Sequence, residues 1–111
     1  MRYYLIDDLQ EKELAQLTSL LQDMEFSAGM DGVFWIPVPD ENLEPIQRTH
    51  TETCGPFVMT LEVEERRVRL ELLVRARGRM RCECVCYASP ALQTRMIAWL
   101  DETLRDLGIV I

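Results

Sequence analysis

An alternation of apolar and polar residues in the second half of the chain limits the fold more than any other feature of this sequence. The runs FVMTLEVE at 57–64, VRLELLVRAR at 68–77 and MRCECVCY at 80–87 place apolar side chains or cysteines at every second position. Successive side chains of a β-strand point to opposite faces, so each run predicts a strand with one apolar and one charged face. The segment 57–87 is therefore predicted to form a three-stranded antiparallel meander.

Two amphipathic helices are predicted on either side of this meander. Asp8, with Glu11 three positions later, resembles a capping box and predicts a helix at about 8–25. A Ser-Pro pair at 89–90 supplies a favoured N-cap and first helical residue, which predicts a helix at about 90–107. Apolar residues recur at intervals of three and four in both segments and give each helix one apolar face. In the first helix this face contains Leu14, Leu17, Leu21 and Met24. In the second, Leu92, Met96, Trp99 and Thr103 run along one side, with Ile97, Leu100, Leu104 and Leu107 beside them.

The remaining segments complete the predicted architecture. Apolar runs at 3–6 and 33–39 are expected to add strands, and 109–111 is a candidate for a further edge strand. Three prolines and a glycine make 39–56 the longest segment predicted to be irregular. Residues 1–111 are therefore predicted to form a single α+β domain. It is a two-layer sandwich, with the meander at the centre of an antiparallel sheet of about four or five strands and both helices on one face.

Charge and hydropathy restrict the expected partners and compartment. The net charge of −7 disfavours non-specific binding to nucleic acid. No stretch reaches the roughly 18 to 20 apolar residues that a membrane-spanning helix requires, and the N-terminus does not resemble a signal peptide. We therefore expect a cytoplasmic protein with reduced thiols and no membrane partner. Residues 1–65 carry a net charge of −11 and residues 66–111 a net charge of +4.

The cysteines allow two interpretations. Cys82, Cys84 and Cys86 form a closely spaced thiol cluster, to which Cys54 and His50 could add ligands for zinc, or a partner for redox chemistry. In the predicted third strand, however, the three cysteines share the inner face, and cysteine is often fully buried as a small apolar residue. The packing interpretation is therefore favoured, which predicts no cofactor and leaves a zinc site as the alternative.

No catalytic motif is present. The chain contains no Cys-x-x-Cys sequence, so it lacks both the thioredoxin-like motif and the second half of the zinc-deaminase motif. His50 is the only histidine and has no identifiable acid–base partner in the sequence. An enzyme that uses 39–56 as a lid over a small ligand is the least favoured hypothesis.

The outer face of the predicted sheet is the expected partner surface. Arginines share this face with apolar and aromatic residues, a combination that is enriched in protein interfaces. In size, charge and element order, the chain resembles small acidic adaptor and chaperone domains such as type III secretion chaperones. We therefore expect a non-catalytic protein-binding or self-associating module, with a homodimer as one form. The candidate surface residues are Trp35, Leu73, Arg75, Arg77, Val85, Tyr87, Ile109 and Ile111.

Overall fold

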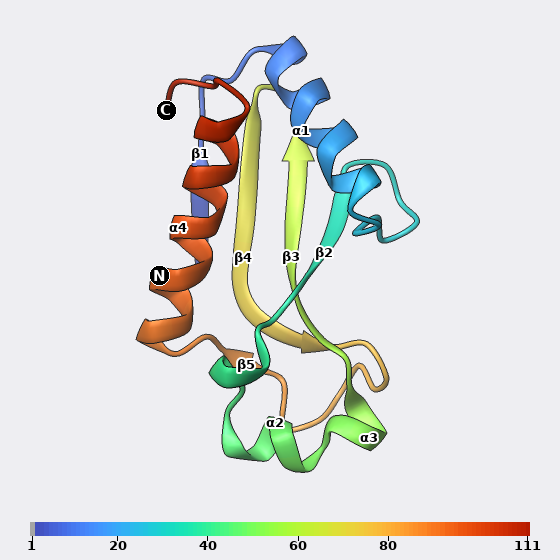
Figure 1. Ribbon diagram of the computed structural model, residues 1–111. Helices are drawn as coiled ribbons and strands as arrows, with labels where there is room; N and C mark the ends of the chain where they lie inside the picture. Colours follow the sequence, from blue (N-terminus) through green and yellow to red (C-terminus); the bar gives the residue numbers. More distant parts are fainter. Residues whose placement is uncertain (1) are drawn as a thin grey trace.

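The computed structural model describes residues 2–111 and shows two long helices packed on one face of a five-stranded antiparallel sheet (Figure 1). The strand order is β1-β4-β3-β2, and β5 pairs with β4 beyond the end of β1. The strands are β1 (Tyr3–Ile6), β2 (Val33–Pro37), β3 (Phe57–Glu64), β4 (Arg67–Ala76) and β5 (Cys86–Tyr87). The helices are α1 (Glu11–Asp23), α2 (Pro45–Thr49), α3 (Thr51–Cys54), α4 (Pro90–Asp106) and the short 3-10 helix η1 (Asp40–Asn42). This arrangement confirms the predicted two-layer α+β sandwich.

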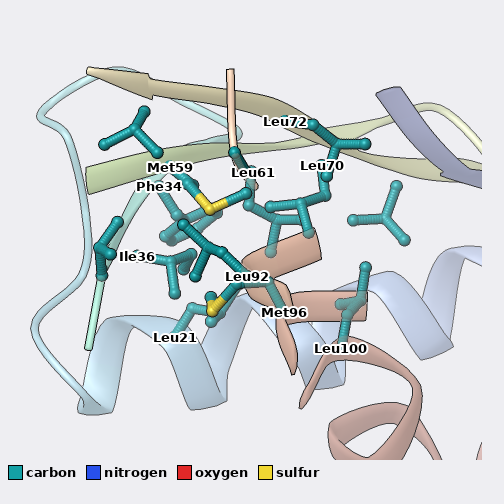
Figure 2. Close-up of a cluster of buried hydrophobic side chains, with 14 of the residues drawn as sticks. Leu21, Phe34, Ile36, Met59, Leu61, Leu70, Leu72, Leu92, Met96 and Leu100 are labelled. Carbon is teal, nitrogen blue, oxygen red and sulfur yellow. The ribbon is translucent and has the colours of Figure 1, made fainter. Parts of the chain in front are cut away.

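The core lies between the inner face of the sheet and the apolar faces of α1 and α4. Leu70 and Leu72 of β4 are fully buried and point toward the helices (Figure 2). Glu71 between them is only partly buried, in line with the alternation of a strand. Leu21 of α1 and Leu92 and Leu100 of α4 meet them from the helical layer. The alternation along β4 and the helical periodicity therefore place apolar residues as predicted.

The two long helices begin differently. Ser89 caps α4 as predicted, because its Oγ accepts a hydrogen bond of 3.2 Å from the backbone N–H of Leu92. At α1 the predicted cap is displaced by two residues. Asp8 has a φ of 60°, a left-handed conformation unlike the extended backbone of an N-cap. Gln10 takes that position, and its N–H donates to Oε1 of Glu13 at 2.8 Å.

The third strand of the predicted meander is much shorter than expected. Of the predicted strand at 80–87, only the two residues of β5 pair with β4, through Leu73 with Tyr87 and Val74 with Cys86. The segment 77–85 leaves the sheet. The N–H groups of Arg77 and Gly78 bond to the chain that precedes β3, and the N–H of Val85 bonds within the segment to Cys82. The strand prediction for 80–85 is therefore wrong. Met80, predicted to lie on the inner face, is 89% exposed.

The segment before β3 also contains more structure than predicted. Residues 39–56 include η1, α2 and α3, and Figure 1 shows α2 and α3 at one end of the molecule, beside the chain that leads to β5. At the C-terminus, residues 109–111 form no strand. Ile109 is only 2% exposed and belongs to the core, so the prediction that it contributes to a partner surface is wrong. Within residues 2–111, no helix combines the length and apolar character needed to cross a membrane.

Candidate metal centre

Four potential metal ligands converge at the end of the molecule where α2 and α3 lie. The Sγ atoms of Cys54, Cys82 and Cys84 and a ring nitrogen of His50 all lie within 4.8 Å of one another. His50 Nδ1 is 3.2 Å from Cys82 Sγ and 3.9 Å from Cys54 Sγ. Cys54 and Cys84 are buried, whereas His50 and Cys82 are partly exposed. The cluster is thus set into the protein with one side close to the surface.

The first pair of ligands is positioned by one turn of helix. His50 lies at the junction of α2 and α3, and the N–H of Cys54 donates to the carbonyl oxygen of His50 at 2.7 Å. Residues four apart on a helix lie on the same face. The His-x-x-x-Cys spacing therefore directs both side chains toward the loop that carries the other two ligands.

The second pair lies on a tight turn. The N–H of Val85 donates to the carbonyl oxygen of Cys82 at 3.1 Å. The backbone N–H of Cys84 is the first of several groups that lower the pKa of Cys82 to about 6. Such a donor stabilises a thiolate, the form in which cysteine binds a metal.

The Cys84 thiol is held in its neutral form. Burial is the main cause that raises the pKa of Cys84 to about 12, with hydrogen bonds to Cys82 and Cys54 adding to it. A buried thiol next to other sulfurs loses its proton only when a cation offsets the new negative charge. The cluster therefore contains one sulfur prepared as a thiolate and neighbours that a metal ion would deprotonate on binding.

A buried amide joins the two halves of the cluster. Gln47 of α2 is 1% exposed, and its Nε2 donates to the carbonyl oxygen of Cys84 at 3.1 Å. Its Oε1 accepts from the N–H of Glu44 at 2.9 Å. The side chain of Gln47 thus connects the turn that carries Cys82 and Cys84 to α2, the helix just before His50 and Cys54.

The backbone makes a second connection. The N–H of Gly78 donates to the carbonyl oxygen of Cys54 at 2.7 Å, and the N–H of Arg77 donates to that of Pro56 at 3.0 Å. A Cβ at Gly78 would lie 2.8 Å from the carbonyl oxygen of Gly55 and 2.9 Å from that of Cys54. Only glycine allows this approach without moving backbone, so position 78 is important for bringing the cysteine turn to α3.

The donor set suits zinc. Zn²⁺ prefers four tetrahedral ligands drawn from cysteine and histidine, and a tetrahedron with Zn–S bonds of about 2.3 Å separates its sulfur atoms by about 3.8 Å. Separations within 4.8 Å are close to that geometry and need only small side-chain adjustments. Four protein ligands leave no open position for water or substrate, which is typical of a structural site.

Four of the five predicted ligand candidates come together, and the fifth does not. Cys86 belongs to β5, and its Sγ lies 3.4 Å from Nε2 of Gln47. Burial, followed by the charge of Glu44, raises the pKa of its thiol. The predicted cluster of Cys82, Cys84 and Cys86 is therefore wrong in its last member. Gln47 was not identified from the sequence, since a single glutamine carries no signal of its own.

The predicted partner residues lie in several places. Trp35, Leu73, Arg75 and Tyr87 share the sheet face that no helix covers. Arg77 follows β4 and stacks on Trp35, with its guanidinium carbon 4.3 Å from the ring centroid. Other arginines on this face pair with glutamates in Arg67–Glu64, Arg69–Glu62 and Arg75–Glu71. Val85 packs against the core from the cysteine turn, and Ile111 is 43% exposed at the C-terminus.

Replacement of the buried amide is expected to destabilise the domain. Gln47→Leu keeps a similar volume but leaves the carbonyl oxygen of Cys84 buried without a donor, which costs about 1–3 kcal/mol. Urea unfolding monitored by circular dichroism measures the change. The control, Gln16→Leu on the exposed side of α1, is expected to change stability by less than about 0.5 kcal/mol. Equal effects of the two substitutions would contradict the role given to Gln47.

Comparison with known proteins finds no match, whether among family models, curated proteins or solved structures.

Proposed function

We propose that this protein is a small zinc-binding domain with a closed, structural Cys3His site formed by His50, Cys54, Cys82 and Cys84. The observation that carries the proposal is the convergence of these four ligand atoms within 4.8 Å, from two segments far apart in sequence. The distance of 3.2 Å between His50 Nδ1 and the Cys82 sulfur supports it, because this contact already joins the two segments.

The proposed role of the ion is to hold one end of the fold. α2, α3 and the segment 77–85 contribute few core residues, whereas the sheet and the long helices bury most of the apolar side chains. A metal bound by both segments would supply the cross-link that their small core does not. We name this part of the protein, residues 45–56 and 77–85, the cysteine lobe.

A second proposed activity is protein binding by the uncovered sheet face. Tyr3, Leu5 and Tyr87 on this face are each more than 40% exposed, although all three are large and apolar or aromatic. Such side chains are enriched where partners bind. A second copy of the chain, giving a homodimer, is one possible occupant. We place these activities in the cytoplasm, where the four free thiols would remain reduced.

Metal content tests the zinc proposal directly. Protein purified without chelator is expected to contain one zinc ion per chain by inductively coupled plasma mass spectrometry. Cys54→Ser is expected to lower this to less than a tenth, because serine is a poor zinc ligand. The matched control is Cys86→Ser, which removes a thiol outside the cluster and is expected to retain the metal.

The opposite result has a clear form. If the wild-type protein neither contains zinc nor binds added zinc in a calorimetric titration, the cluster is a packing feature and the proposal is wrong. If Cys86→Ser loses the metal as completely as Cys54→Ser, the ligand set is wrong.

A further inference from the structure

A groove on the uncovered sheet face combines an apolar floor with positive charge. It has a volume of about 260 Å³ and lies where β2, β3 and the end of β4 meet the start of the cysteine lobe. Its lining consists of Trp35, Val58, Arg75, Ala76, Arg77 and Met80. None of these residues is a ligand of the proposed zinc site, so the groove is a separate feature.

The floor and the rim of the groove have different characters. Val58 and Ala76 are 3% and 5% exposed and form an apolar floor. Met80, by contrast, is 89% exposed and stands at the rim. An unbranched thioether side chain in this position adapts its shape to a bound apolar group. The groove can therefore cover one aliphatic side chain, with Met80 closing over it.

The charge beside the groove is not neutralised within the protein. Across residues 2–111, carboxylates lie within 4.0 Å of Arg67, Arg69, Arg75 and Arg95, whereas Arg77, Arg79 and Arg81 form no ion pair. These three arginines flank Met80 and are all exposed. The net charge of the chain is −7, so this segment is a local positive patch on an acidic molecule. A guanidinium binds carboxylates in a bidentate manner.

We infer that the groove and its arginines bind a peptide segment of a protein partner in which an aliphatic residue is flanked by aspartate or glutamate. The aliphatic side chain enters the groove between Trp35 and Met80, and the carboxylates pair with Arg79 and Arg81. The acidic residues of the peptide are inferred from the positive charge of the arginines. Its aliphatic residue is inferred from the apolar floor of the groove. This inference deepens the protein-binding activity proposed above and rests on it.

Nucleic acid fits this surface less well. Single strands bind basic grooves through bases stacked on exposed aromatic rings. The ring of Trp35 is already occupied by the guanidinium of Arg77, which lies 4.3 Å from its centroid. An overall charge of −7 repels a polyanion at longer range. An acidic segment of a second copy of the chain is a further alternative. Measurement of the oligomeric state distinguishes it, because this alternative requires a dimer.

The test uses short peptides and the zinc-loaded protein, residues 1–111. The panel consists of fluorescein-labelled nine-residue peptides with Leu, Ile, Val or Met at the centre and Glu or Asp on both sides. Fluorescence anisotropy measures affinity, and at least one peptide is expected to bind with a dissociation constant below 1 mM. Replacement of its central residue by serine, or of its acidic residues by lysine, is expected to raise the dissociation constant of that peptide at least tenfold.

Variants locate the binding site. The double variant Arg79→Glu, Arg81→Glu and the single variant Met80→Asp change only exposed residues, so both are expected to fold. Each is expected to weaken binding at least tenfold. Arg105→Glu, an exposed arginine on α4, is the matched control and is expected to leave the affinity within twofold.

Several results would overturn the inference. One is that no peptide of the panel binds at 1 mM. Another is that the double variant binds the peptides as tightly as the wild type does. A third is that a labelled 12-nucleotide single strand binds more tightly than any peptide. A stable dimer in sedimentation that the double variant abolishes would show that a second copy occupies the surface instead. Metal content and uptake of added zinc are measured on the same samples, so peptide binding by a protein that neither contains nor takes up zinc would disprove the zinc proposal alone.

Discussion

Removal of zinc is expected to open the cysteine lobe while the sheet and the long helices stay folded. A strong chelator takes away the cross-link between the two ligand pairs, and few buried apolar residues remain to hold that end together. Backbone bonds such as Gly78 to Cys54 then become accessible to solvent. Hydrogen exchange measured by mass spectrometry is expected to show at least a hundredfold loss of protection in 45–56 and 77–85. Protection in α4 and β4 is expected to fall less than in the cysteine lobe, because these elements exchange only when the whole domain unfolds.

A control and two contradicting outcomes accompany this hydrogen-exchange experiment. Addition of zinc to the chelated protein is expected to restore the protection, and Cys86→Ser is expected to behave like the wild type. Unchanged protection in the cysteine lobe would show that packing alone holds it. Complete unfolding would show that the helical layer also depends on the metal, contrary to the division of the core described above.

The second large effect is expected in the core. Leu72 is fully buried on β4, where it lies among side chains from the sheet and the helices (Figure 2). Leu72→Ala removes these contacts and leaves a cavity, which typically costs about 2–5 kcal/mol. For a domain of this size, each kcal/mol corresponds to a shift of roughly 4–8 °C in the melting temperature. Urea denaturation and thermal melts of the zinc-loaded protein measure the loss.

The matched control for this substitution lies on the other face of the same sheet. Leu5 of β1 is 46% exposed on the face that no helix covers, so Leu5→Ala is expected to cost less than about 1 kcal/mol. A loss at Leu72 no greater than that at Leu5 would contradict the placement of the core between sheet and helices.

Residue patterns predicted the parts of the fold that repeat regularly. The period of two along β4 and the helical spacing of Leu92 and Met96 each specify which side chains face inward, and the structure confirms them. Trp99 and Thr103, predicted on the same side of the second helix, are only partly buried, and the neighbouring Leu100 and Leu104 are buried instead. The same period failed at 80–85, where Met80 is 89% exposed and the thiols of Cys82 and Cys84 lie beside His50 and Cys54 instead of on the sheet. The spacing of apolar residues does not show which backbone groups are free to pair.

The candidate metal centre was only partly accessible from the sequence. His-x-x-x-Cys and Cys-x-Cys are visible spacings, but nothing in either one indicates that the two pairs meet. Their meeting follows from the register of the β3–β4 hairpin, in which Phe57 pairs with Ala76. Residues just before Phe57 and just after Ala76 must then lie side by side. The hairpin was predicted correctly. The wrong prediction of a third strand after it, however, placed Cys82 and Cys84 on the sheet, away from His50 and Cys54.

The position of the ligands at the open ends of this hairpin has a consequence for how the chain folds. A metal bound to Cys54 and Cys82 closes the segment between them, including β3 and β4, into a ring. Closing a loop of about 30 residues by a cross-link removes conformational entropy from the unfolded chain equivalent to roughly 3–4 kcal/mol. The ion therefore restricts the disordered ensemble as well as the native state. Zinc bound before the hairpin forms would shorten the search for its register, so the proposed site predicts that refolding is faster with zinc than without it.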